Sequence, residues 1–202
     1  SPTPTITAFG SVYLNYFEGF EGNLAQLLRN GSWDTTSTLA HHGSHSFTDS
    51  RIGTYAAGIT TFFQTPPVIL GSSPVLQYSH IAIIAFGDIG YVEISKNAGA
   101  SFTVLKAYNM TMRPEWQDSL ASPADWYTDA FQLSAYAGDT VIVRFRLVPN
   151  STVNTDGWYI DDILLGDPTM SATATQSFIQ GWNMISLPFE VADGRRVTLY
   201  PD

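Results

Sequence analysis

The run Asp-Gly-Trp-Tyr-Ile-Asp-Asp-Ile-Leu-Leu, residues 156–165, constrains the fold more than any other stretch of the chain. In an extended strand, residues of even number share one face and residues of odd number share the other. From Trp158 onward, each face is then apolar apart from one carboxylate, Asp162 on the first and Asp161 on the second. A charge in an apolar strand costs free energy unless it is paired or binds a cation. The run therefore predicts the last strand of a β-sandwich, with at least one Asp directed at a metal ion or a backbone donor.

Short runs of β-branched and aromatic residues follow one another from residue 32 onward, separated by Gly, Pro, Asn and Ser. This spacing is typical of a β-sandwich or jelly roll and not of alternating strands and helices. One short helix is expected at residues 24–29, ended by Asn30-Gly31. The predicted fold class is all-β, a jelly-roll (concanavalin-like) sandwich of two antiparallel sheets. The expected strands are residues 8–17, 33–39, 45–48, 60–63, 68–70, 75–84, 90–95, 103–108, 126–133, 140–147 and 157–165.

The two ends of the chain differ in composition from its middle. We expect an extended N-terminal segment at residues 1–12, the sandwich at residues 13–167, and a linker with an isolated β segment at residues 168–202. Free strand edges invite strand addition, so the last segment predicts self-association with a neighbouring chain, or the start of a following module. The residues expected to mediate assembly are Phe178, Ile179, Trp182, Met184, Ile185 and Leu187.

Charge and composition exclude several classes of partner. The formal net charge is -9, which argues against nucleic acid, because phosphate binding needs clustered Lys and Arg. The chain contains no cysteine, which excludes disulfides, thiolate metal sites and a cysteine nucleophile. No apolar run is long enough to span a membrane. This acidic composition is typical of a secreted or surface-displayed protein.

Several passages, taken in their order along the chain, resemble a known family. They are residues 20–22 (Phe-Glu-Gly) with Trp33, 42–50 with Tyr55, 90–95 with Gly99, 133–138, 143–147 and 156–163. Together they resemble the secreted bacterial β-sandwich that accompanies immune-inhibitor-A-type and subtilisin-type proteases, a MAM-like domain similar to jelly-roll carbohydrate-binding modules. The resemblance covers residues 13–166. Residues 181–188 are similar to the opening of a module near the C-termini of large bacterial surface proteins.

This resemblance implies a bound calcium ion. In jelly-roll relatives a Glu after the first strand and an Asp in the last strand meet at one ion, which implies Glu21 and Asp162 here. Asp49 is a possible third ligand, and Asp161 is the alternative to Asp162 because strand parity can slip by one residue. Calcium takes six to eight oxygen ligands. The alternative interpretation is that Asp162 accepts backbone N–H groups and Glu21 lies in a solvated loop.

Three histidines, His41, His42 and His45, crowd one short segment. Their spacing is not that of a zinc finger and no cysteine accompanies them. We interpret the segment as a turn rich in Gly and Ser.

Three aromatic residues, Trp116, Trp126 and Tyr127, lie in a segment rich in Pro and Asp. Planar rings near carboxylates suit the faces and hydroxyls of sugars, so these residues are candidates for a glycan platform. Alternatively, Trp126 and Tyr127 begin a core strand and Trp116 holds a loop in place.

The function expected from these features is a non-catalytic interaction module of the adhesion type, secreted or at a bacterial cell surface, stabilised by calcium. Its partner is expected to be a protein or a glycan. A nucleophile elbow and an H-E-x-x-H motif are both absent from the sequence, so no enzyme activity is predicted. Two alternatives stay open: a structural subunit of an extracellular filament or surface layer, and a carbohydrate-binding module of a secreted enzyme.

Overall fold

The structure, a computed structural model, describes residues 12–150 and 152–168. The chain divides into two units, Ser1–Thr169 and Met170–Asp202, and all described residues belong to the first. The expected assembly residues Phe178, Ile179, Trp182, Met184, Ile185 and Leu187 lie outside the described residues. Self-association through them therefore stays a prediction.

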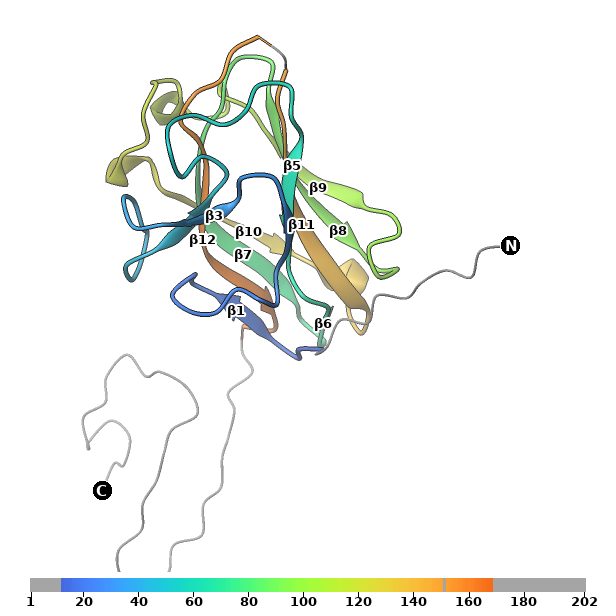
Figure 1. The fold of residues 1–202 in the computed structure, drawn as a ribbon. Coiled ribbons are helices and arrows are strands. Elements are labelled where there is room, and N and C mark those ends of the chain that lie inside the picture. Colours follow the sequence, from blue (N-terminus) through green and yellow to red (C-terminus); the bar gives the residue numbers. More distant parts are fainter. Residues whose placement is uncertain (1–11, 151, 169–202) are drawn as a thin grey trace, which may run out of the picture. The chain divides into compact units, whose positions relative to one another are not determined.

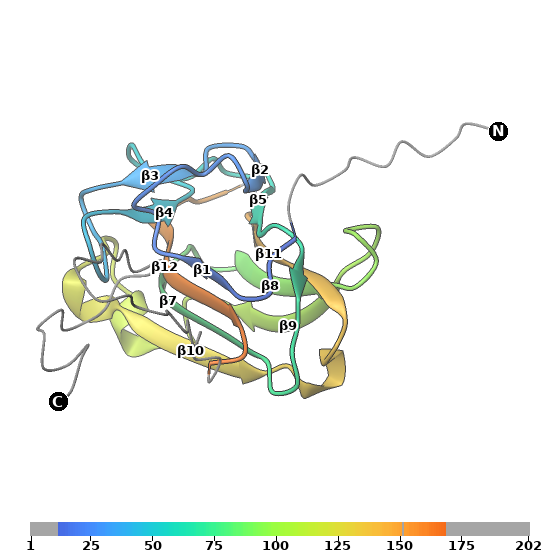
Figure 2. The same cartoon turned by 90° about the horizontal axis from the view of Figure 1, so that it is seen from below.

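Two antiparallel sheets pack face to face as a jelly-roll sandwich, which confirms the predicted fold class (Figures 1 and 2). Sheet 1 has the strand order β10-β7-β12-β4-β3, with β1 also paired to β12. Sheet 2 has the order β2-β5-β11-β8-β9, with β6 also paired to β11. The strands are β1 (Tyr16–Glu18), β2 (Leu28–Asn30), β3 (Asp34–Thr36), β4 (Ser46–Thr48), β5 (Thr61–Gln64), β6 (Val68–Ile69), β7 (Val75–Ile83), β8 (Ile89–Ser95), β9 (Thr103–Tyr108), β10 (Tyr127–Gln132), β11 (Thr140–Val148) and β12 (Gly157–Gly166).

Each sheet is built around one long strand that has a continuous neighbour on one side and two short neighbours on the other. Strand β12 pairs with β7 on one side and with β4 and β1 on the other. Strand β11 pairs likewise with β8, and with β5 and β6. Pro66 and Pro67 separate β5 from β6, because proline has no N–H to donate to a ladder.

Aromatic rings from both sheets fill the space between them. Phe63 of β5 lies 4.8 Å from the Trp33 ring and 4.9 Å from the Phe145 ring, measured between centroids. Phe47 and Trp158 complete this cluster, and both are fully buried. Ring contacts of this kind add to the stabilisation from apolar burial.

Strand β12 contains one extra residue, which changes the predicted alternation. Asp161 pairs with Ser79 and Leu164 pairs with Gln77, so three steps along β12 match two steps along β7. Asp162 supplies the extra residue and has a φ of 49°. This is a β-bulge, and it reverses the parity of the strand.

The bulge directs both carboxylates away from the space between the two sheets. Trp158 and Ile160 before it, and Ile163 and Leu165 after it, are all completely buried. The prediction that one Asp accompanies each apolar face was therefore wrong, because it assumed a regular strand. Asp161 and Asp162 both lie on the outer side of sheet 1.

The predicted helix at residues 24–29 was also wrong. Only one turn forms there, in which Leu27 N–H donates to the Leu24 carbonyl at 3.0 Å, and β2 begins at Leu28. Six residues are too few to repay helix nucleation, whereas pairing with β5 satisfies the backbone. The helices of the described residues are the 3₁₀ turns Pro114–Trp116, Pro123–Asp125 and Ser134–Tyr136.

Within residues 12–150 and 152–168, no helix has the length and apolar character needed to cross a membrane.

Candidate functional site

Asp161 anchors the segment between β3 and β4 that carries the histidines, residues 41–45, here called the histidine loop. Its Oδ2 accepts the backbone N–H of His41 at 2.8 Å and that of His42 at 3.2 Å. Its Oδ1 accepts the N–H of Asp162 at 2.8 Å. Asp161 is completely buried, and burial raises its pKa to about 6. A carboxylate in the last strand therefore accepts backbone donors, which is the role that the alternative interpretation gave to Asp162.

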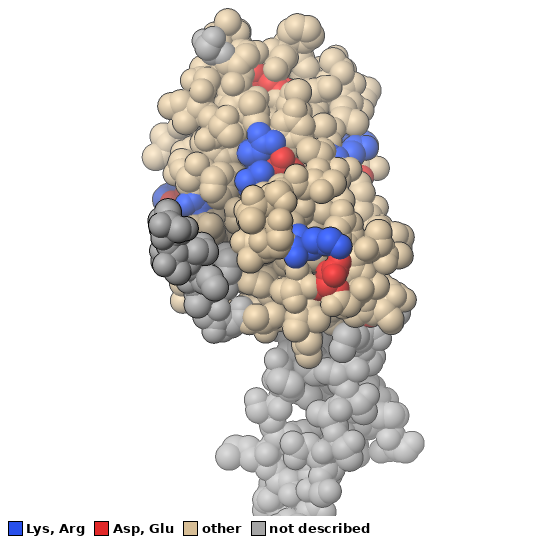
Figure 3. Space-filling view, turned by 90° about the vertical axis from the view of Figure 1, so that its right-hand side faces the viewer, with Lys and Arg blue, Asp and Glu red and all other residues tan. Residues whose placement is uncertain are grey.

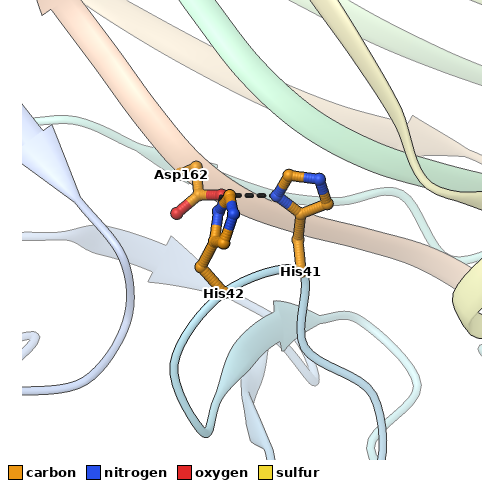
Figure 4. Close-up of side chains that lie close together, drawn as sticks. All are labelled: His41, His42 and Asp162. Atoms are coloured by element: carbon orange, nitrogen blue, oxygen red, sulfur yellow. Dashed lines mark hydrogen bonds and ion pairs between the residues drawn. The ribbon is translucent and has the colours of Figure 1, made fainter.

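Asp162 faces two imidazole rings. Its Oδ2 lies 2.6 Å from His41 Nδ1 and 2.5 Å from His42 Nδ1. Figure 4 shows the carboxylate, which comes from β12, with the two rings of the histidine loop directed toward it. The hydrogen bond with Asp162 raises the pKa of His42. The bulge directs the Asp162 carboxylate toward the histidine loop, at the surface of the sandwich.

Glu21 holds the other end of the histidine loop. Its Oε1 accepts the N–H of Ser44 at 2.6 Å and that of His45 at 2.7 Å, and its Oε2 lies 3.1 Å from His45 Nδ1. The hydrogen bond from the Ser44 N–H contributes most to lowering the pKa of Glu21. Gly43, the residue before Ser44, has a φ of 67°, and a Cβ there would clash with Glu21 Oε1. Glycine is therefore required for the close approach of this carboxylate.

Asp49 lies apart from these groups, beside the start of β12. Its Oδ1 accepts the N–H of Trp158 at 2.9 Å, whereas its Oδ2 is buried without a hydrogen-bond partner among the described residues. Along a strand, the step from Trp158 to Asp162 is about 13 Å. Asp49 and Asp162 are therefore not brought to one point.

The expected calcium ligands thus have other contacts. Glu21 accepts two backbone N–H groups, Asp161 accepts three, and Asp162 faces two ring nitrogens. Calcium requires a shell of oxygen atoms. The donor set around Asp162 is a poor match to such a shell, and calcium stabilisation of the chain stays a prediction.

A groove of about 510 Å³ lies on the outer face of sheet 1, here called the sheet 1 groove. Its apolar lining is Phe17 of β1, which is 65% exposed, and Leu164 of β12. Its polar lining consists of Gln77, Ser79, Thr128, His41, His42 and Asp162. The hydroxyls of Ser79 and Thr128 lie 2.8 Å apart. The groove combines one exposed ring with amide, hydroxyl, imidazole and carboxylate groups, and sequence reasoning did not identify Phe17 or Gln77.

The three aromatic residues predicted to form a glycan platform do not form one exposed surface. Trp116 is 1% exposed and donates its Nε1–H to the Asp125 carbonyl at 2.9 Å, so it holds a loop in place within the core. Trp126 is partly buried against the His41 ring, with centroids 5.5 Å apart. The Tyr127 ring is covered by the Arg113 guanidinium at 3.8 Å.

The outer face of sheet 2 carries a second polar cluster. Glu93 of β8 is nearly buried and accepts hydrogen bonds from Arg144 at 2.7 Å and from Arg146 at 2.6 Å. Burial opposes the ionisation of Glu93, but the two arginines outweigh it and lower its pKa. Figure 3 looks onto the side of the molecule that carries β8 and β9, where charged side chains occur as basic groups next to acidic ones. The guanidiniums are therefore already paired.

His80, the histidine farthest from the loop in sequence, lies in the core. It is completely buried and its Nδ1 accepts the Trp158 Nε1–H at 3.2 Å. Its Nε2 lies 3.5 Å from Asp129 Oδ2, and burial lowers its pKa. These contacts tie His80 to packing between β7, β10 and β12.

Comparisons with known proteins support the fold. No protein-family model matches the chain. The chain is 26% identical over 183 residues to Bacillopeptidase F of Bacillus subtilis. The aligned region covers 86% of this chain and 12% of that protein. The chain thus spans about an eighth of the length of this curated relative.

Solved structures of similar fold include two adhesin domains of Lys-gingipain. The K2 domain has 21% identity and a TM-score of 0.52, and the match covers 75% of this chain and 98% of that domain. The K1 domain, from Porphyromonas gingivalis W83, has 15% identity and a TM-score of 0.52, with 75% and 96% covered. At these identities the likeness shows the jelly-roll fold that this chain shares with them.

Proposed function

We propose that this chain is a non-catalytic, extracellular interaction module of the adhesion type, and that it binds a glycan in the sheet 1 groove. The observation that carries the proposal is the lining of this groove. The exposed Phe17 ring offers a flat apolar face for the C–H groups of a sugar ring. Gln77 and Asp162 offer amide and carboxylate groups for its hydroxyls.

The position of the groove supports this proposal. Its lining comes from the anchored histidine loop and from four strands that are neighbours in sheet 1 in the order β10-β7-β12-β1. A site on rigid strands holds its polar groups in place before the ligand arrives, which lowers the entropic cost of binding. Figure 1 shows these strands side by side in one layer.

The comparisons support an accessory role for the chain. The solved domains of similar fold are named adhesin domains, and the curated relative is a peptidase of which this chain matches only a small part. A binding module that accompanies a larger extracellular protein fits both observations. The MAM-like resemblance of the sequence points in the same direction.

Binding of the whole chain to an array of glycans tests this proposal. We expect binding to at least one class of glycan, and a loss of affinity of about tenfold for Gln77→Ala, the scale of one lost hydrogen bond to a ligand. Gln132→Ala is the matched control, since Gln132 is an exposed glutamine of sheet 1 that does not line the groove. The absence of binding on the array would contradict the proposal that the ligand is a glycan. Equal losses of affinity in both variants would contradict the sheet 1 groove as its binding site.

A further inference from the structure

We propose that His41, His42 and Asp162 form a binding site for a zinc-type transition-metal ion. One ring nitrogen of each histidine and one carboxylate oxygen all lie within 4.8 Å of one another (Figure 4). Tetrahedral zinc with bonds of about 2.0–2.1 Å places its donors about 3.3 Å apart. The present separations from Asp162 Oδ2, 2.6 and 2.5 Å, therefore need to widen by less than about 1 Å to admit the ion.

The donor atoms select the kind of metal. Imidazole nitrogen is a preferred ligand of zinc, copper and nickel, whereas calcium and magnesium take oxygen. Two ring nitrogens with one carboxylate oxygen make a set that is common in zinc sites with an open position. Among the described residues this is the one such group of three metal-ligating side chains.

Contacts with residues outside the proposed metal site hold its three ligands together. Side chains of neighbouring residues usually diverge, but Asp161 binds the backbone N–H groups of both His41 and His42 and so fixes the local turn. The His41 ring also packs against Trp126, and its centroid lies 4.3 Å from that of His42. The bulge places Asp162 opposite the two rings. Outer contacts of this kind orient metal ligands and raise affinity.

Three protein ligands leave one position of a tetrahedral ion open. All three ligands also line the sheet 1 groove, so the open position is accessible from it. A water molecule, or an oxygen atom of a ligand in the groove, fits this position. The metal site stands on its own geometry and does not depend on what the groove binds.

Calorimetric titration of the full chain with zinc chloride tests the site, using protein that carries no histidine tag and has been treated with a chelator. We expect one zinc ion per chain. His42→Ala and Asp162→Asn should each weaken binding at least about tenfold, because each removes a direct ligand. Asn tolerates the left-handed φ of residue 162, so this variant keeps the bulge.

His45→Ala is the matched control, since His45 belongs to the same loop but contacts Glu21. This variant should keep the affinity of the unaltered chain. Cobalt in place of zinc should give the visible absorption of a tetrahedral site in the unaltered chain and lose it in His42→Ala. The absence of zinc binding, or an equal loss in His45→Ala and His42→Ala, would overturn the proposal. A melting temperature raised by calcium and not by zinc would overturn it in favour of the calcium prediction.

Discussion

Asp49 is an aspartate whose carboxyl group lies in a buried environment. It is 1% exposed, one of its carboxylate oxygens accepts the Trp158 N–H, and the other has no partner among the described residues. Burial raises its pKa from 3.8 to about 7, and the nearby charge of Asp156 adds to this effect. The folded state therefore favours a protonated Asp49.

The raised pKa gives a pH dependence of defined sign. Between about pH 4 and pH 7 the folded chain retains a proton that the unfolded chain has released, so Asp49 lowers the free energy of unfolding as pH rises. Asp49→Asn cannot ionise and still accepts the Trp158 N–H. We expect the variant to be more stable than the original chain by about 2–4 kcal/mol at pH 8, with the difference vanishing near pH 4.

Urea denaturation of both proteins from pH 4 to pH 8 measures this difference. Asp118→Asn serves as the control, because it makes the same substitution at an exposed aspartate. A stability difference for Asp49→Asn that stays constant across this pH range would contradict the assignment.

Single residues also show where sequence reasoning reached its limit. The family resemblance implied that Glu21 and Asp162 meet at one calcium ion, whereas in the structure they contact different parts of the histidine loop. The spacing of His41 and His42 indicated only a turn, because their shared partner lies 121 and 120 residues away in the chain. Contacts of that separation depend on the packed fold and leave no local pattern.

At the scale of the element, β12 shows how one extra residue changes which side chains of a strand face the core. The composition of residues 157–165 was sufficient to predict a strand, and β12 spans Gly157–Gly166. The alternation of apolar residues could not reveal the bulge, because the same sequence is equally compatible with a regular strand that has one Asp on each face. Burial of four apolar side chains outweighs the cost of the positive φ at Asp162.

Two single-residue deletions in β12 test the bulge. Deleting Asp162 removes the extra residue and leaves Ile163 and Leu165 directed at the core, whereas deleting Leu164 turns Leu165 outward. We expect the second deletion to lower the free energy of unfolding by at least about 2 kcal/mol more than the first, the scale of one lost buried leucine. Chemical denaturation compares them, and equal stability of the two proteins would mean that the parity is not reset at Asp162.

The turn between β8 and β9, residues 96–100, depends on local sequence more than β12 does. Asn and Gly favour turns because they tolerate positive φ, and the structure has φ values of 55° at Ala98 and 84° at Gly99. Asn97 contributes through its side chain, whose Oδ1 accepts the Ser101 N–H at 3.0 Å. Local turn chemistry is strong here, whereas β2 forms only because β5 offers it a partner.

At the scale of the whole molecule, the sandwich brings distant segments to one face. The sheet 1 groove takes residues from β1 near the start of the chain, from the histidine loop, from β7 and β10, and from β12. The sequence was sufficient to predict the two antiparallel sheets, since turn residues recur between short β-rich runs. It was not sufficient to predict which outer face is hollowed, because strand order depends on long-range pairing.

The sheet 1 groove is the proposed binding surface. Its most direct test compares how the removal of each of two partly exposed rings, one on each outer face of the sandwich, changes the affinity for a glycan. Phe17 lines the groove, and Tyr91 lies on the outer face of sheet 2 beneath the Arg146 guanidinium at 4.7 Å. For the glycan that binds most tightly, we expect Phe17→Ala to lower the affinity about tenfold and Tyr91→Ala to leave it within about twofold. A loss of affinity with Tyr91→Ala and none with Phe17→Ala would contradict the groove and place the binding surface on sheet 2.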